Sequence, residues 1–181
     1  KKGLNIIKET YNPESNLNEL DLSKKIELAY DLQAGNYIDF AKKNEVLLKN
    51  YSYEIAKIID ENCKKKENIF LDAGTGEMTS LTQILNQVSV SFKKIFAFDM
   101  SFSRIFLGKK YVKENLKTKN KIISFCSEMS KIPLPNNSVD TIITMHSLEP
   151  NRGRLREILK ELFRISKSKI LLFEPYYETS N

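Results

Sequence analysis

The chain has 181 residues, of which 41% are hydrophobic and 29% are charged, a balance typical of one folded domain and not of a disordered chain. Its formal net charge is +6. Because the basic residues are scattered along the chain, they indicate a solvated surface more than a nucleic-acid footprint. No apolar run reaches the roughly 20 residues of a membrane helix, so no membrane span is expected. The two cysteines form neither a CxxC zinc pair nor a disulfide framework, so we expect a cytoplasmic protein.

Helical patterns come first along the chain. Apolar residues recur at helical spacing over residues 23–41, although Gly35 weakens the pattern, and a second helix is predicted over residues 45–62. We expect these two leading helices to belong to an amino-terminal extension or lid that spans residues 1–52.

Short apolar runs alternate with helical patterns in the rest of the chain. The predicted strands are residues 69–71, 95–98, 122–125, 139–145 and 170–173. Helical spacing is found over residues 79–88, 105–112 and 154–165. Continuous apolar strands separated by helices are typical of a parallel sheet that is covered on both faces. We therefore predict a doubly wound, mainly parallel α/β domain over residues 53–181.

A glycine-rich loop, Asp-Ala-Gly-Thr-Gly at residues 72–76, follows the first predicted strand. Glycines spaced by one residue allow a sharp turn and a close approach to a ligand, and the next helix aims its amides at the same place. A tight turn without a ligand is the alternative interpretation. A nicotinamide or flavin fingerprint would need glycine where Thr79 stands, and the charge of Asp72 would repel a pyrophosphate. The loop therefore favours a cationic ligand without phosphate, such as S-adenosylmethionine.

Asp99 ends the second predicted strand. A carboxylate at this place can accept hydrogen bonds from both ribose hydroxyls of a nucleoside. The alternative is an N-cap for the following helix, a role that Ser101 or Ser103 could fill equally well.

In this order, the motifs resemble those of the class I S-adenosylmethionine-dependent methyltransferases, over about residues 53–175. Residues 68–77 are similar to the glycine-rich first motif of that family, and residues 96–101 to its ribose-binding second motif. Residues 127–140 are similar to the adenine-side loop, and residues 145–149 to the segment that closes over the cofactor.

The resemblance implies a Rossmann-like fold and S-adenosyl-L-methionine as cofactor, without a metal. It implies methyl transfer to a small-molecule, sugar or lipid acceptor by in-line attack on the sulfonium methyl. The residues expected to bind the cofactor are Asp72, Ala73, Gly74, Thr75, Gly76, Asp99, Met100, Ser127, Glu128, Met129 and Met145. Tyr30 and Tyr37, on one face of the first predicted helix, are also expected to bind the cofactor, as residues of a lid over the site. The alternative interpretation is that both tyrosines pack in the core.

His146 is the only histidine of the sequence and follows the fourth predicted strand. As a general base it could take a proton from an acceptor hydroxyl, and as the alternative it lines the pocket. Because no other side chain titrates near neutral pH by default, we name His146 as the candidate catalytic residue.

The chain also departs from the family pattern: Met78 stands where a third glycine is frequent, and Pro150 where many relatives have histidine.

A non-catalytic S-adenosylmethionine-binding or partner module is the alternative function, since the third glycine and a clear base are missing. Nucleic-acid bases are not expected as acceptors, because residues 146–150 lack the Asn/Asp-Pro-Pro-aromatic pattern of enzymes that methylate base amino groups. The fifth strand is expected to be an uncovered edge close to the last residue. We expect that the chain is part of a longer protein, or that a second copy covers this edge in a homo-oligomer.

Overall fold

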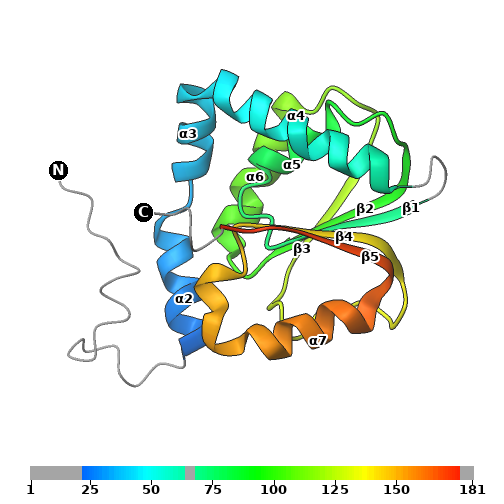
Figure 1. Ribbon diagram of the computed structural model, residues 1–181. Coiled ribbons are helices and arrows are strands. Elements are labelled where there is room, and N and C mark those ends of the chain that lie inside the picture. Colours follow the sequence, from blue (N-terminus) through cyan, green and yellow to red (C-terminus); the bar gives the residue numbers. More distant parts are fainter. Residues whose placement is uncertain (1–21, 64–67, 176–181) are drawn as a thin grey trace.

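Five strands form one parallel sheet in the computed structural model, which describes residues 22–63 and 68–175 (Figure 1). The strands are β1 (Asn68–Ala73), β2 (Phe92–Asp99), β3 (Ile122–Cys126), β4 (Val139–Met145) and β5 (Ser166–Phe173). Their order in the sheet is β3-β2-β1-β4-β5, and every neighbouring pair is parallel. This arrangement confirms the predicted α/β class.

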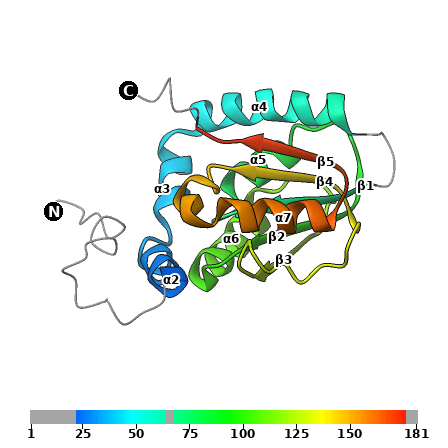
Figure 2. The ribbon, with the colours of Figure 1, turned by 60° about the horizontal axis from the view of Figure 1, so that its bottom comes forward.

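The helices from residue 45 onward are α4 (Glu45–Asn62), α5 (Thr79–Leu85), α6 (Phe102–Asn115) and α7 (Leu155–Ile165), with a 3-10 turn η1 (Glu149–Arg154) before the last. Helices cover both faces of this sheet, and Figure 2 shows α7 on the opposite side of the strands from α5. Phe70 and Leu71, neighbours on β1, point to opposite faces because side chains alternate along a strand. Phe70 packs in the cluster of α4 and α5, whereas Leu71 packs in the cluster of α7.

The first predicted helix, residues 23–41, is wrong in one point. The structure divides it into α2 (Leu22–Leu32) and α3 (Asn36–Lys43). Gly35 lies between them with φ +104°, a left-handed conformation that an α-helix cannot contain and that glycine adopts without a Cβ penalty. The second predicted helix has the predicted bounds as α4, and the boundary expected after residue 52 lies inside it.

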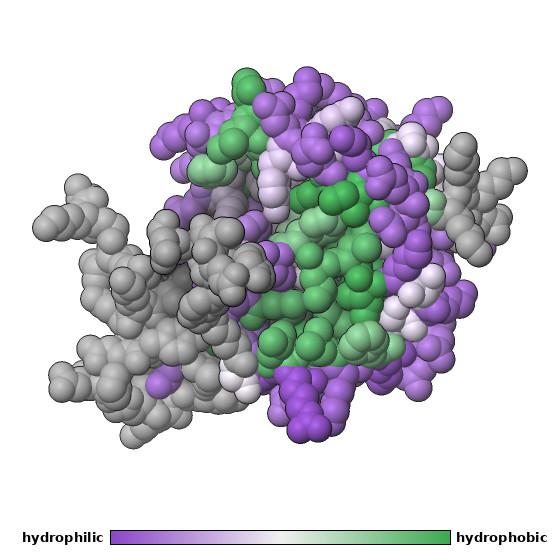
Figure 3. Space-filling model, viewed as in Figure 1, coloured by the Kyte–Doolittle hydropathy of each residue, from purple (hydrophilic) through white to green (hydrophobic). Residues whose placement is uncertain are grey.

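An apolar surface lies between α4 and α7, beside β5 (Figure 3). Exposed apolar side chains on these elements include Leu47, Ile58, Phe163 and Leu172. Among the described residues β5 has no strand on its outer side, so the predicted edge is present. Within the same residues, no helix has the length and apolar character needed to cross a membrane.

Candidate active site

A cavity of about 520 Å³ lies at the carboxyl ends of the parallel strands. Its walls come from the loop after β1, the ends of β2 and β4, the loop after β3, and the helices α2 and α3. In open parallel sheets, ligands bind at this edge where the strand order reverses, here between β1 and β4. The volume also falls in the range of pockets that bind small molecules and cofactors.

The structure brings most of the predicted site residues to this cavity. The predicted residues that line it are Tyr30, Tyr37, Gly74, Thr75, Gly76, Asp99, Met100, Ser127, Glu128, Met129, Met145 and His146. Asp72 and Ala73 are fully buried in β1 and are not among the lining residues. A direct role of these two residues in cofactor binding therefore stays a prediction.

The glycine loop is fixed from both sides. The amides of Gly74 and Thr75 donate to the carbonyl oxygen of Phe98, at 2.9 and 2.8 Å. Gly74 has φ +79°, and a Cβ there would lie 2.5 Å from Cβ of Ser147. Gly76 has φ +55°, and a Cβ there would meet nothing within 4 Å. Gly74 is thus needed for close packing, whereas Gly76 presents bare backbone to the open cavity, as a close ligand approach requires.

Asp99 is 6% exposed and lines the cavity. Its carboxylate accepts the amide protons of Gly76 and Ser101, each at 2.9 Å. Ser101 is the N-cap of α6, because its hydroxyl accepts from the amide of Arg104 at 3.1 Å, so Asp99 is not the cap. Burial raises the pKa of Asp99 against the effect of these hydrogen bonds. Each carboxylate oxygen uses one acceptor position, which leaves capacity for the hydroxyls of a ribose.

Asp72 lies behind the glycine loop. One carboxylate oxygen accepts from the hydroxyl of Thr75 at 2.6 Å, and the other is buried without a hydrogen-bond partner among the described residues. Burial raises the pKa of Asp72 to about 7, the Thr75 hydrogen bond opposes this rise, and the charge of Asp99 adds to it. A positive charge in the cavity would therefore favour the ionised form of Asp72.

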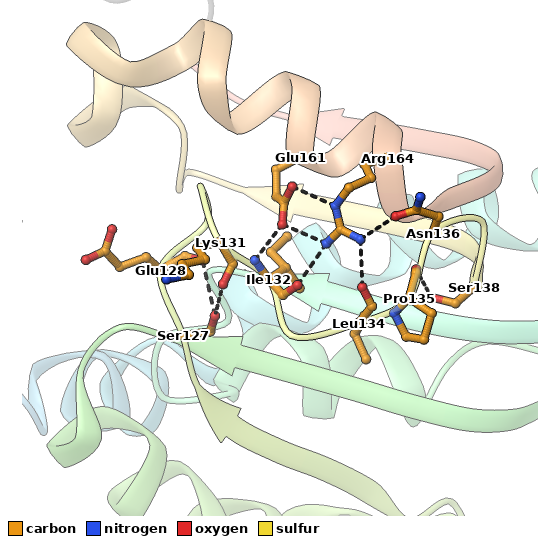
Figure 4. A network of polar contacts seen from close by, with 10 residues as sticks. All are labelled: Ser127, Glu128, Lys131, Ile132, Leu134, Pro135, Asn136, Ser138, Glu161 and Arg164. Carbon is orange, nitrogen blue, oxygen red and sulfur yellow. Dashed lines mark hydrogen bonds and ion pairs between the residues drawn. The ribbon is translucent and has the colours of Figure 1, made fainter.

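The adenine-side loop between β3 and β4 contains no helix, and α7 holds it in place (Figure 4). The guanidinium of Arg164 donates to the carbonyl oxygens of Ile132 and Leu134, both at 2.9 Å. Glu161 accepts the amide proton of Ile132 at 2.8 Å and forms an ion pair with Arg164 at 2.7 Å. These contacts fix the loop that carries Glu128 to the cavity.

Glu128 itself has a partner that the sequence analysis did not assign. Its carboxylate forms an ion pair with Arg154 of η1 at 3.0 Å, and Arg154 also lines the cavity. The pair joins the adenine-side loop to the segment after β4. The sequence showed that Arg154 lies in the segment after the fourth strand, but Arg154 is 26 positions from Glu128, so the sequence did not indicate that the two side chains are in contact.

His146 has φ +50°, which is uncommon for a residue other than glycine. Its amide donates to the carbonyl oxygen of Phe173 at 3.1 Å, and its Nε2 lies 3.2 Å from the hydroxyl oxygen of Tyr51. Burial, together with the charge of Glu174, raises the pKa of Tyr51, so this hydroxyl keeps its proton at neutral pH. Glu174 also accepts the amide proton of Ser147 at 3.2 Å, which fixes the loop next to His146. The backbone of His146 is therefore fixed against β5, whereas its imidazole contacts Tyr51 of α4.

Glu77 and Arg104 also line the cavity and are charged residues that were not among the predicted site residues. Glu77 accepts the amide protons of Gly35 and Ile38, both at 2.8 Å, and so ties the α2–α3 connection to the glycine loop. Arg104 stands in the first turn of α6, close to Asp99 in the sequence. That proximity to a predicted ribose ligand was the signal that could have identified it.

The charges around the cavity favour a cation. The acidic lining residues are Glu77, Asp99, Glu128 and Glu149, and the arginines are Arg104 and Arg154. S-adenosylmethionine has a sulfonium and an ammonium group, and its ribose offers hydroxyls to a carboxylate. The bare backbone at Gly76 and the free acceptor capacity of Asp99 fit this cofactor.

Solved structures with the same fold include several methyltransferases. A protein from Methanococcus maripaludis, assigned to the S-adenosyl-L-methionine-dependent methyltransferases, has 22% identity and a TM-score of 0.60, with 79% of this chain and 64% of that chain covered. A SAM-dependent methyltransferase from Aquifex aeolicus has 29% identity and a TM-score of 0.51, with 61% and 57% covered. The [4+2]-cyclase SpnF has 15% identity and a TM-score of 0.58, with 80% and 57% covered. The chain thus spans less than two thirds of the length of these structures.

No curated protein matches the chain in sequence. The model of the methyltransferase domain family, however, matches residues 71–173, which extend from β1 to the end of β5 and contain the glycine loop, Asp99 and His146. This match covers more than half of the chain, and its limits agree with the extent of the sheet. The chain therefore belongs to the methyltransferase domain family, within the class I S-adenosylmethionine-dependent methyltransferases.

Proposed function

We propose that this chain binds S-adenosylmethionine in the cavity and transfers its methyl group to a small-molecule, sugar or lipid acceptor. Family membership supports the cofactor and the class of reaction. The observation that carries the proposal is the pairing of Gly76 and Asp99 at one wall of the cavity. There, bare backbone and a buried carboxylate with free acceptor capacity stand 2.9 Å apart, from amide nitrogen to carboxylate oxygen.

The proposed orientation follows the walls of the cavity. The ribose hydroxyls donate to Asp99, and the adenine lies against Met100 and the loop of Glu128 and Met129. The methionine end lies along the glycine loop, with Asp72 behind it. In this orientation the nucleoside is bound at both ends, at the adenine by the loop between β3 and β4 and at the ribose by the carboxylate of Asp99.

S-adenosylmethionine, when bound, supplies an electrophilic methyl group on a sulfonium. The residues of the chain bind and orient the two reactants, and this alignment can provide much of the rate enhancement of a methyl transfer. Tyr30 and Tyr37 on α2 and α3 cover the cavity and exclude water. His146 is the candidate for removal of the acceptor proton. Its Nε2 lies beside the Tyr51 hydroxyl, so we expect that the residue contributes chiefly by lining and shaping the acceptor end.

A second candidate is an S-adenosylmethionine-binding module that does not transfer a methyl group. Two observations favour it: the engaged Nε2 of His146, and the presence of a [4+2]-cyclase among proteins with the same fold. A fold of this kind supports more than one chemistry, so turnover with an acceptor separates the two candidates.

We further propose a cytoplasmic location, because Cys63 and Cys126 are both free thiols. The scattered positive charge supports a small-molecule acceptor and not a nucleic acid. The apolar surface beside β5 supports a covering partner, either a second copy or further chain.

Isothermal titration calorimetry with S-adenosylmethionine, S-adenosylhomocysteine and NAD tests the proposal. We expect both adenosyl compounds to bind more tightly than NAD. Asp99→Ala should weaken S-adenosylhomocysteine binding at least tenfold, because two hydrogen bonds to a charged acceptor are lost, each worth about 1.5–3 kcal/mol. Asp39→Ala, on the exposed part of α3, is the matched control and should bind like the wild type. Tighter binding of NAD, or equal affinity after the Asp99 change, contradicts the proposal.

A further inference from the structure

Arg104 has an unusual environment for an arginine. The residue is 6% exposed, and its Cζ lies 4.1 Å from the ring centroid of Tyr30 and 5.1 Å from that of Tyr37. Within the described part of the chain, its side chain forms no ion pair, and its Nε is buried without a hydrogen-bond partner. The guanidinium therefore lies within cation–π distance of two aromatic rings, and its Nε–H has no hydrogen-bond acceptor among the described residues.

Burial of a cation without hydrogen bonds is costly, and cation–π contacts offset only part of that cost. The negative charges of Asp31 and Asp99 attract the positive charge of Arg104 electrostatically, but neither carboxylate forms an ion pair with it among the described residues. An arginine has five N–H donors and no acceptor. Because Arg104 lines the cavity, a ligand that offers acceptor oxygens would complete its hydrogen bonding.

The position of Arg104 indicates which part of a ligand it meets. It stands in the first turn of α6, directly after the end of β2 where Asp99 lies, and both side chains line the cavity. A ribose diol contains hydroxyl donors and hydroxyl oxygens that accept. An ionised Asp99 can only accept, and Arg104 can only donate. The two side chains are thus complementary to the two halves of the same diol.

We propose that Arg104 is a second ribose-binding residue, which donates to the hydroxyl oxygens of the cofactor while Asp99 accepts the hydroxyl protons. This inference rests on the proposed function. Tyr30 and Tyr37 fix the plane of the guanidinium, so its donors are oriented before the cofactor binds.

The helices that carry the two tyrosines, α2 and α3, are themselves anchored by hydrogen bonds. Asp31 at the end of α2 accepts from the hydroxyl of Ser101 and from the amide of Ser103, the latter at 3.1 Å. These hydrogen bonds lower the pKa of Asp31, although partial burial acts in the opposite direction. With the Glu77 contacts to α3, they anchor both helices beside α6 and keep the rings against Arg104. The leading helices therefore orient a binding residue as well as cover the cavity.

A cycle that changes both protein and ligand tests this role. The variant is Arg104→Met, which retains an unbranched chain as far as the position of Nε but removes every donor. The ligands are S-adenosylhomocysteine and its 2′,3′-dideoxy analogue, both measured by calorimetry. For S-adenosylhomocysteine we expect at least tenfold weaker binding to the variant, since a hydrogen bond from a charged group is lost. For the dideoxy analogue we expect equal affinities for variant and wild type.

Arg156→Met on the exposed face of α7 is the control for the loss of one positive charge and should leave both affinities unchanged. An equal loss of affinity for both ligands, or no loss for either, overturns the inference, because a purely structural role does not distinguish the diol. If the wild type does not bind S-adenosylhomocysteine at all, the proposed function falls, and this inference falls with it.

Thermal unfolding checks that Arg104→Met folds, which we expect because the buried Nε has no hydrogen-bond partner to lose among the described residues. Tyr37→Leu provides a second variant, since Tyr37 is 52% exposed and its loss leaves the core intact. It removes one ring from the guanidinium and also a lid contact, so binding of S-adenosylhomocysteine should weaken more than binding of the dideoxy analogue. An equal loss for both ligands in this variant also overturns the inference, because the lid contact does not distinguish the diol.

Discussion

The two glycines of the loop after β1 give a matched pair of substitutions, Gly74→Ala and Gly76→Ala. Both residues have positive φ, so alanine is strained at either position, by about 1–2 kcal/mol. Only at position 74 would the new Cβ also collide, at 2.5 Å from Cβ of Ser147 and 2.8 Å from Cε of Met129. Overpacking of this kind costs about 1–3 kcal/mol in addition. We therefore expect a loss of about 2–5 kcal/mol for Gly74→Ala and about 1–2 kcal/mol for Gly76→Ala.

Urea unfolding followed by far-ultraviolet circular dichroism measures this difference, since the chain has no tryptophan to report by fluorescence. Binding of S-adenosylhomocysteine should follow a different order. The Cβ of Gly76→Ala would enter the open cavity, so this variant should lose affinity although its fold is affected less. Equal destabilisation by the two substitutions would refute the proposed packing of Gly74 against Ser147. Unchanged affinity in Gly76→Ala would refute the ligand-facing role of Gly76.

Three other substitutions test the site. Burial raises the pKa of Asp72 from 3.8 to about 7 in the folded protein. The folded state therefore holds the Asp72 proton over a pH range in which the unfolded state has lost it, and the stability that this gives is complete below pH 3.8 and is lost as the pH rises to 7. Between pH 4 and 7 the wild type should thus lose up to about 4 kcal/mol relative to Asp72→Asn in urea unfolding, and parallel profiles would contradict the burial argument. Arg164→Lys retains the charge but not the fork of donors, and should lower the free energy of unfolding by about 1–3 kcal/mol; an unchanged midpoint would show that the loop is held in another way. His146→Ala should reduce turnover less than tenfold in a steady-state assay, whereas a loss of about 10²–10⁴ would identify a general base.

The sequence predicted the sheet well, because each strand contains a short apolar run, and the central strands β1 and β4 are buried on both faces. It also predicted the glycine loop and Asp99, since both depend on local backbone needs at a strand end. The sequence left open whether Asp99 is the N-cap of the following helix. The structure answers this question, because Ser101 caps α6. Met78 has φ +55°, which explains why glycine is frequent at this position, while its buried side chain packs against Gly108.

The contacts that the sequence did not reveal join residues far apart in the chain. Examples are the ion pair of Glu128 with Arg154 and the anchoring of Gly35 by Glu77. Periodicity reports which face of one element is buried, but not which element lies opposite. The break at Gly35 was visible as a weakened helical pattern, but the Glu77 carboxylate that accepts its amide proton lies 42 residues away in the sequence and was not.

Native mass spectrometry of the purified chain, titrated with S-adenosylmethionine and NAD in competition, tests the central claim most directly. We predict one adenosyl ligand bound per chain as S-adenosylmethionine or S-adenosylhomocysteine, with NAD displaced, and a strong reduction of that species in Asp99→Ala. Absence of any bound adenosyl compound, or retention of NAD in its place, would contradict the assignment of this cavity to S-adenosylmethionine.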